Sequence, residues 1–138
     1  MLNIKCINPE IINGLALCGH GDKVLIADGN YPLGSKTCGA KKIYLGLMPG
    51  LPTVTQVLEA LLSACRVEAA AVMSPYDGSE PEIFAQFQTA LDGLEAEQLG
   101  RYQFYDACCS PDVKLAISTG ETRTFANILL TIGCAPGE

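Results

Sequence analysis

Two kinds of apolar pattern alternate along this 138-residue chain, and few folds accommodate both. Short apolar runs of strand length are separated by longer stretches in which apolar residues recur at helical spacing. Such interleaving is typical of parallel strands joined by crossover helices. No internal repeat and no polar linker divides the sequence. We therefore predict a single α/β domain over residues 1–138, with a largely parallel sheet covered by helices.

Capping residues, Gly and Pro indicate where the predicted elements begin and end. Asn8 can cap a helix whose first residue is Pro9, and Thr53 can cap a second helix. The predicted helices cover residues 9–18, 53–64 and 82–98, with a short helix or turn at 105–110. The predicted strands cover residues 23–27, 43–45, 66–73, 101–104, 113–118 and 128–132. We expect loops at 29–42 and 75–81.

The charge and hydropathy of the chain exclude several classes of partner. The net charge is −6, and no basic cluster is larger than Lys41–Lys42, so nucleic acid is not an expected partner. The apolar runs are too short to span a membrane, and residues 1–14 do not resemble a signal peptide. Hydrophobic residues make up 49% and charged residues 17%. This composition fits a homo-oligomer or a well-filled monomer core, and favours neither.

The seven cysteines are scattered and include no CxxC pair, which argues against a zinc ribbon or a thioredoxin-like site. Cys108 and Cys109 are adjacent, a spacing that seldom suits a disulfide. We predict reduced thiols in a cytoplasmic protein, most of them buried as small apolar groups. One reactive thiol stays an alternative.

The stretch GHGDKVLIADGNYP, residues 19–32, contains the only histidine, His20, at one end of the predicted strand 23–27 and Asp28 at the other. An imidazole titrates near neutral pH and so suits proton transfer, although a lone histidine is often structural. Asp28 lies where a strand meets a turn, a common place for ligands in α/β sheets. It is equally suited to an Asx-turn. We interpret Asp22 as structural.

Three stretches together resemble the ribose pyranase / fucose mutarotase family: GHGDKVLIADGNYP at 19–32, GRYQFY at 100–105 and TGETRTFANILL at 119–130. The resemblance covers nearly the whole chain, and the fucose mutarotase branch is the closer match. It implies an isomerase that interconverts anomers or ring forms of a free monosaccharide, L-fucose-like or possibly ribose, without a cofactor. It also implies a toroidal homodecamer of two stacked pentameric rings, with sites between neighbouring subunits.

The resemblance assigns a role to six residues. It makes His20 the proton donor and assigns substrate binding to Asp28, Arg101, Phe125, Ala126 and Asn127. The residues themselves are compatible with these roles, since Arg101 offers fixed donors and Asn127 offers both a donor and an acceptor to sugar hydroxyls. Arg101 is as readily read as a surface residue. We expect Glu121 to order the loop before Phe125.

Phe125 departs from the family pattern, which usually has tyrosine at this position. Phenylalanine keeps a ring face for stacking on a pyranose but has no hydroxyl. A hydroxyl from Tyr31, Tyr102 or Tyr105 can replace the missing one. The departure also supports an alternative function, a sugar-binding ring protein of the same family that is not catalytic or only weakly so.

The spacing of His20 and Asp28 limits how one sugar can contact both. Eight residues of extended chain at ~3.3 Å each separate the two side chains by roughly 20 Å or more. Either the glycine-rich ends of the strand curl inward, or His20 and Asp28 of different subunits meet.

Other catalytic classes lack their signatures. The stretch after His20 has no third glycine of a GxGxxG motif, and it follows a helix rather than a strand. A catalytic zinc site would need a second histidine, so we predict no metal site. No GxSxG nucleophile elbow is present either.

Overall fold

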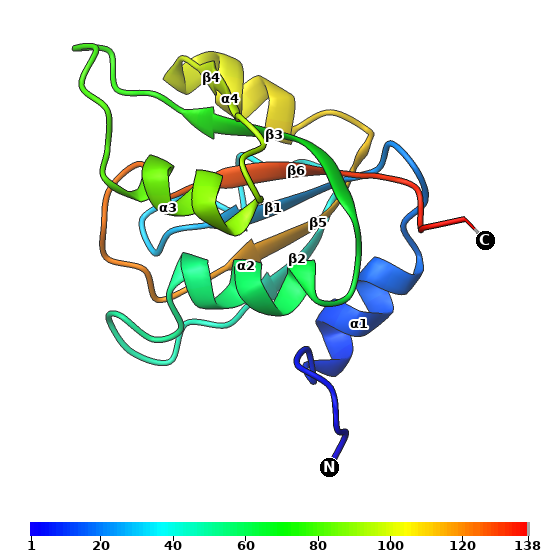
Figure 1. The fold of residues 1–138 in the computed structure, drawn as a ribbon. Helices are drawn as coiled ribbons and strands as arrows, with labels where there is room; N and C mark the ends of the chain where they lie inside the picture. The colour runs from blue at the N-terminus through cyan, green and yellow to red at the C-terminus, as the bar shows by residue number, and fades with distance from the viewer. Residues whose placement is uncertain (138) are drawn as a thin grey trace.

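The computed structural model describes residues 1–137 and is built around one six-stranded sheet with the strand order β2-β5-β1-β6-β3-β4 (Figure 1). The strands are β1 (Lys23–Ala27), β2 (Lys41–Tyr44), β3 (Val67–Met73), β4 (Glu97–Leu99), β5 (Val113–Ser118) and β6 (Ile128–Ile132). Only β6 runs antiparallel to its neighbours, β1 and β3; the other pairs are parallel. The predicted largely parallel α/β sheet is confirmed.

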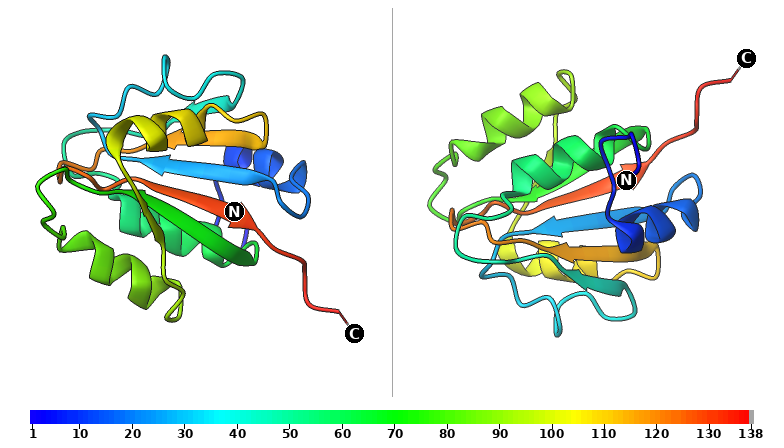
Figure 2. Two further views of the ribbon diagram at one scale, coloured as in Figure 1. Left: turned by 90° about the horizontal axis from the view of Figure 1, so that it is seen from above. Right: turned by 90° about the horizontal axis from the view of Figure 1, so that it is seen from below.

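Helices cover both faces of this sheet (Figure 2). The helices are α1 (Pro9–Ala16), α2 (Val54–Leu62), α3 (Ile83–Ala90) and α4 (Arg101–Cys108). Alternate residues of β1 point to opposite faces. Val24 and Ile26 pack in the cluster with α1, α2 and α3, whereas Leu25 packs with α4 and the loop that follows β1. None of the helices within residues 1–137 is long and apolar enough to cross a membrane.

Both predicted helix caps are present. The Asn8 side chain accepts a hydrogen bond from the backbone N–H of Ile11 at 3.0 Å. Thr53 forms a capping box, since its hydroxyl accepts from the N–H of Gln56 at 3.2 Å and the Gln56 side chain accepts from the N–H of Thr53 at 2.9 Å. These local bonds satisfy backbone donors that the helix leaves unpaired.

The helix predicted over 82–98 is too long. α3 ends at Ala90, and Asp92 and Gly93 adopt positive φ angles of 56° and 87° that a helix cannot continue through. The chain then forms β4, which pairs with β3 and extends the sheet. The apolar residues keep helical spacing across this region, so their pattern did not indicate that the helix ends before Asp92 and Gly93.

The strand predicted at 101–104 is wrong, because Arg101 begins helix α4. The aromatic residues of this stretch favour strands by propensity. In the fold, Phe104 and Cys108 lie one helical turn apart and are both fully buried against the sheet. Tertiary packing therefore decides the conformation here.

The prediction that all cysteines are reduced is also wrong. Cys38, in the loop after β1, forms a disulfide with Cys109 at the end of α4, and their Cα atoms are 4.9 Å apart. The free thiols are Cys6, Cys18, Cys65, Cys108 and Cys134. The sequence could not indicate this pairing, because the two cysteines are 71 positions apart and only the fold brings them together.

Candidate functional site

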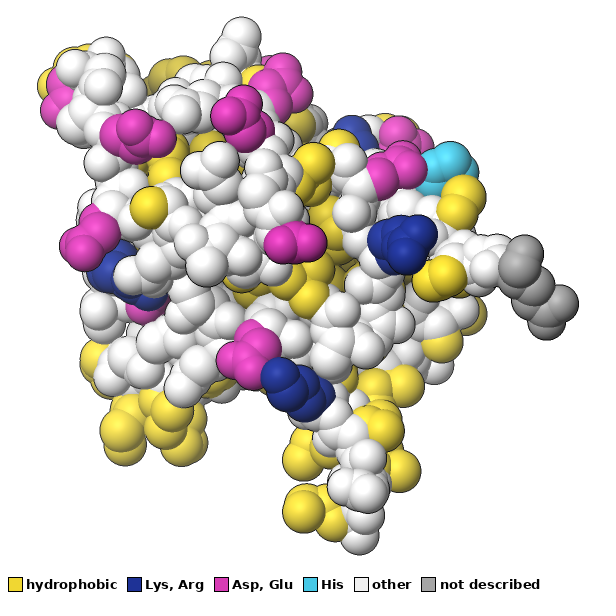
Figure 3. Space-filling model, viewed as in Figure 1, with side chains coloured by type: hydrophobic (Ala, Val, Ile, Leu, Met, Phe, Trp, Pro, Cys, Tyr) yellow, Lys and Arg dark blue, Asp and Glu magenta, His cyan; other side chains and the backbone are white. Residues whose placement is uncertain are grey.

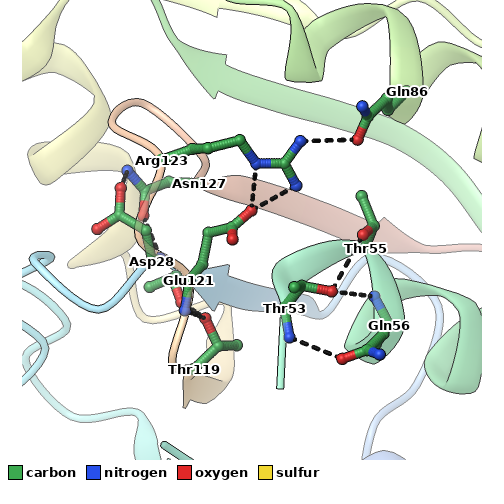
Figure 4. Close-up of polar contacts among 10 residues, drawn as sticks. Asp28, Thr53, Thr55, Gln56, Gln86, Thr119, Glu121, Arg123 and Asn127 are labelled. Carbon is green, nitrogen blue, oxygen red and sulfur yellow. Dashed lines mark hydrogen bonds and ion pairs between the residues drawn. The ribbon is translucent and has the colours of Figure 1, made fainter. Parts of the chain in front are cut away.

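The candidate binding residues gather at the edge of the sheet where the parallel strands end. Asp28 follows β1, and Asn127 precedes β6, which runs in the opposite direction beside β1. The backbone N–H of Asp28 donates to Asn127 Oδ1 at 2.8 Å, and Asn127 Nδ2 donates to Asp28 Oδ2 at 3.2 Å (Figure 4). The two residues, 99 positions apart in sequence, form one buried polar pair.

The Asp28 carboxyl group is held by its surroundings in a defined direction. Its Oδ1 accepts from the N–H of Asn30 at 2.9 Å, which is the Asx-turn contact expected for an aspartate at this position. Burial raises the pKa of Asp28 above its ordinary value, and the hydrogen bonds from Asn30 and Asn127 oppose that rise. The structural and the binding interpretation of Asp28 are therefore compatible.

A second buried carboxylate orders the loop that leads to Asn127. The Glu121 side chain is 3% exposed and accepts from Arg123 Nε at 2.8 Å, while Arg123 Nη1 donates to Gln86 of α3 at 3.0 Å (Figure 4). The carbonyl of Glu121 accepts from the N–H of Gly29, directly after Asp28. The loop is thus bonded to α3 on one side and to the Asp28 turn on the other, as expected of Glu121.

Phe125 adopts an unusual backbone conformation. Its φ angle is 59°, in the left-handed region that bulky residues rarely occupy. The ring is partly buried against the cluster around Leu25, and the next residue, Ala126, is fully buried. Such backbone strain persists only where the surroundings enforce it, and it is common at binding sites. Here the packing of the Phe125 ring and the burial of Ala126 hold the segment in place.

Arg101 lies at the first position of α4, after β4, and thus also at the carboxyl edge of the sheet. It is exposed, and its Nε donates to the Tyr105 hydroxyl at 3.2 Å, one helical turn away. The guanidinium also lies 5.7 Å from the centre of the Tyr105 ring. Tyr105 therefore orients Arg101.

Phe125 lacks a hydroxyl, and three tyrosines are candidates to replace it. Their contacts differ. The buried Tyr31 donates its hydroxyl to the carbonyl of Lys36 at 2.9 Å, and burial raises the pKa of Tyr31. Tyr102 is largely exposed. Tyr105 packs edge-on against Tyr31, and its hydroxyl accepts the hydrogen bond from Arg101 Nε. Of the three, Tyr105 is the one grouped with another candidate binding residue.

His20 lies at the opposite edge of the sheet, in the turn before β1. Its Nε2 is 2.9 and 3.0 Å from the two carboxylate oxygens of Glu68, near the start of β3. The histidine lies on the surface beside acidic side chains (Figure 3). Because the extended strand Lys23–Ala27 lies between them, His20 and Asp28 are separated by about 16 Å of strand at ~3.3 Å per residue. The ends of the strand do not bring these two residues of one chain together.

Sequence reasoning missed three residues of this arrangement: Glu68, Tyr105 as the partner of Arg101, and Arg123. The spacing of Arg101 and Tyr105 would have indicated the contact if the segment had been recognised as a helix. Glu68 and Arg123 carry no comparable sequence signal, since each meets its partner only through the fold. Among residues 1–137, no group of three or more His, Cys, Asp or Glu side chains is placed to hold a metal ion.

Comparison with known proteins gives consistent matches over nearly the whole chain. Residues 1–135 match the RbsD / FucU transport protein family. The D-ribose pyranase of Variovorax paradoxus is 32% identical over 139 residues, which cover 96% of this chain and 98% of the relative. The fucose mutarotase of Mus musculus is 32% identical over 146 residues, which cover 94% of this chain and 90% of the relative.

Two solved structures also match the fold over nearly the whole chain. The structure of Bacillus subtilis RbsD complexed with D-ribose has a TM-score of 0.85 at 29% identity, and the match covers 99% of this chain and 100% of that chain. The fucose mutarotase from Streptococcus pneumoniae in complex with L-fucose has a TM-score of 0.82 at 26% identity, with coverage of 99% and 100%.

Proposed function

This chain belongs to the RbsD / FucU transport protein family, and from that premise we propose that it is a monosaccharide mutarotase. It interconverts the anomers or ring forms of a free sugar, as the names D-ribose pyranase and fucose mutarotase describe for two relatives. The proposal takes residues 1–138 as one mutarotase-like domain, of which the structure describes 1–137, and places it in the cytoplasm.

The reaction needs two proton transfers and no cofactor. The bond between the anomeric carbon and the ring oxygen breaks, the anomeric hydroxyl gives its proton to a base, and the ring oxygen receives a proton. Closure on the other face of the carbonyl reverses both transfers. His20 is the proton donor in this proposal, because an imidazole both gives and takes protons near neutral pH.

The observation that carries the proposal is the buried pair of Asp28 and Asn127 at the carboxyl edge of the sheet. A carboxylate accepts hydrogen bonds from paired sugar hydroxyls, and this one is held in a fixed direction by hydrogen bonds from Asn30 and Asn127. Phe125 and Ala126 precede Asn127, so a ring face for stacking lies in the same loop. Arg101, oriented by Tyr105, adds fixed donors at the same edge of the sheet, after β4, which is separated from β6 by β3.

Within this class we propose an L-fucose-like substrate, with ribose as the alternative. The stretch that contains Arg101 resembles the fucose mutarotase branch, and Phe125 offers an apolar face to a deoxy position. The relatives include both D-ribose pyranases and a fucose mutarotase, so they support the class of reaction rather than one sugar.

The proposed site is shared between subunits of a homodecamer of two pentameric rings. His20 and Asp28 of one chain lie at opposite edges of the sheet, so a small sugar that contacts both must lie between two chains. Exposed apolar side chains support assembly: Tyr44 at the end of β2 and Leu47, Met48 and Leu51 in the segment after it are 41–74% exposed. Figure 3 shows apolar side chains projecting from the surface at the bottom of the view.

Saturation-transfer NMR on a panel of free aldoses, including L-fucose and D-ribose, tests the proposal. Catalysis predicts exchange between anomer signals above the spontaneous rate, and a folded His20→Ala protein should lose it. Line broadening without faster exchange would identify the alternative, a sugar-binding protein that is not catalytic. The departure of Phe125 from tyrosine is the observation that favours this alternative.

A further inference from the structure

Glu68 is presented to His20 by an irregularity in β3. Val67 pairs with Ile132 and Ala69 pairs with Thr131, so Glu68 is an extra residue opposite β6. A bulge of this kind changes the direction of a side chain and is often found beside a functional site. Gly133 makes room for it, because a Cβ at that position would lie 3.2 Å from Glu68 Cβ.

The turn that holds His20 is bonded to the same end of β6. The N–H of Gly21 donates to the carbonyl of Ile132 at 2.9 Å, and the N–H of Ile132 donates to the carbonyl of Asp22 at 2.8 Å. The Asp22 side chain accepts from the N–H of Gly19 at 2.8 Å and closes the turn. β6 therefore fixes the backbone on both sides of the contact between His20 and Glu68.

The contact involves one nitrogen of the imidazole and leaves the other available. Nε2 lies 2.9 and 3.0 Å from the two Glu68 oxygens, whereas Nδ1 has no hydrogen-bond partner within residues 1–137. The two side chains are 57% and 45% exposed. Such an exposed pair contributes little to the stability of a fold. Its geometry instead bears on the orientation of the ring and on the choice of tautomer.

We infer that Glu68 is a positioning residue for His20: its carboxylate accepts the Nε2–H of the imidazole, so that Nδ1 is the atom that exchanges a proton with the sugar. This inference rests on the proposed function. When the bond between the anomeric carbon and the ring oxygen breaks, Nδ1–H of the imidazolium gives its proton to the ring oxygen, while solvent water takes the proton of the anomeric hydroxyl and returns one to the carbonyl oxygen when the ring closes. The neutral ring keeps its proton on Nε2, and Nδ1 takes a proton back when the ring closes. A carboxylate that fixes the tautomer and orientation of a catalytic imidazole plays the same part in hydrolase triads.

The single histidine makes this inference directly measurable by NMR. All imidazole signals of the protein belong to His20, so ¹⁵N shifts report which ring nitrogen is protonated in the intact protein. In the neutral ring of the wild type we expect the proton on Nε2. In Glu68→Ala we expect the mixture of tautomers of a free imidazole. This readout does not depend on any sugar or on catalysis.

Kinetics supply the second readout. Glu68→Gln and Glu68→Ala should each reduce kcat for anomer exchange about tenfold, equivalent to about 1.4 kcal/mol, because the donor is less well oriented in the transition state. KM should stay within about twofold, since Glu68 contacts His20 and none of the proposed binding residues. The matched control is Glu97→Gln, an exposed carboxylate on β4, which should leave kcat and the His20 shifts unchanged.

The outcomes separate this inference from the function on which it rests. Wild-type kcat and an unchanged tautomer in both Glu68 variants would overturn the inference while leaving the mutarotase function intact. An equal loss in Glu97→Gln would also overturn it. If the wild type exchanges no sugar, the proposed function fails, and the ¹⁵N shifts still decide whether Glu68 fixes the tautomer of His20.

Discussion

At the scale of single residues, the two candidate groups differ most in their surroundings. Asp28 is 3% exposed and bonded to Asn30 and Asn127, so its direction is fixed before any ligand arrives. His20 lies at the surface and is oriented by one contact with Glu68. The binding part of the proposed site is therefore rigid in each chain, whereas the proton donor depends on a contact that solvent reaches.

The raised pKa of Asp28 predicts how sugar binding depends on pH. Since burial raises the pKa above the ordinary 3.8, the carboxylate becomes protonated at a higher pH than an exposed aspartate does. A protonated group loses acceptor capacity, so sugar affinity should fall as the pH is lowered towards that range. Stability depends on pH with the opposite sign: the contribution of Asp28 is greatest below pH 3.8 and is lost as the pH rises through the raised pKa.

Calorimetric titration of sugar between pH 7 and pH 4 measures this dependence. Asp28→Asn is the control, because it should bind weakly and with little dependence on pH. Affinity in the wild type that is constant over the whole range would contradict the binding role of Asp28.

Phe125→Tyr tests whether the missing hydroxyl limits the rate. A positioned hydrogen bond is worth roughly 0.5–1.5 kcal/mol, and each 1.36 kcal/mol is about tenfold in rate. We expect anomer exchange to rise several-fold to about tenfold, measured by NMR across the sugar panel. Phe125→Leu, which removes the ring, should weaken sugar binding. A uniform loss of activity in Phe125→Tyr would show that phenylalanine is an adaptation to a less polar sugar face.

At the scale of elements, the antiparallel strand β6 connects the two parts of the proposed site. Its first residues place Asn127 beside Asp28, and its last residue, Ile132, holds the turn of His20. One strand therefore organises both edges of the sheet. On the face opposite α1, α2 and α3, the loop after β1 and helix α4 are joined by the disulfide of Cys38 and Cys109.

Removal of this disulfide should lower stability. Cross-links over long loops typically stabilise proteins by about 2–4 kcal/mol, and here the cysteines are 71 positions apart. We expect Cys38→Ser, or treatment with dithiothreitol, to lower Tm by roughly 6–15 °C in thermal denaturation. Cys134→Ser, which changes an exposed free thiol, should have no effect. An identical Tm with and without reductant would mean that the cross-link does not form in solution.

At the scale of the whole molecule, the two halves of the proposed site lie at opposite edges of one sheet (Figure 1). Neither edge combines a proton donor with the Asp28–Asn127 pair. The apolar segment that includes Leu47 and Met48 lies outside the core of the chain. Assembly of neighbouring chains would explain both facts, because it would bring the proton donor of one chain to the Asp28–Asn127 pair of another and would bury the apolar segment.

Mixed assemblies test whether the site is shared. His20→Ala and Asp28→Asn should each be inactive alone, whereas co-expressed chains should recover about a quarter of the wild-type rate, because random mixing unites two intact groups in one site of four. Light scattering should give ten times the 14.6 kDa mass of the chain. A stable monomer with full activity would exclude the shared site.

The sequence by itself determined the fold class, five of the six strands, and the caps at Asn8 and Thr53. These features depend on local chemistry: apolar periodicity, capping side chains and turn residues act over a few positions. Prediction from the sequence failed where local propensity and tertiary packing favour different conformations. The aromatic stretch from Arg101 favoured a strand by propensity, but burial of Phe104 and Cys108 on one face made it a helix.

Only the tertiary structure decided which distant residues meet. The pairing of Asp28 with Asn127, of His20 with Glu68, and of Cys38 with Cys109 depends on strand order and register. A one-residue bulge in β3 directs Glu68 towards His20, and no local pattern in the sequence indicates where such a bulge lies. Contacts of this kind follow from the packing of the whole chain, because each residue finds its partner only after the sheet has formed.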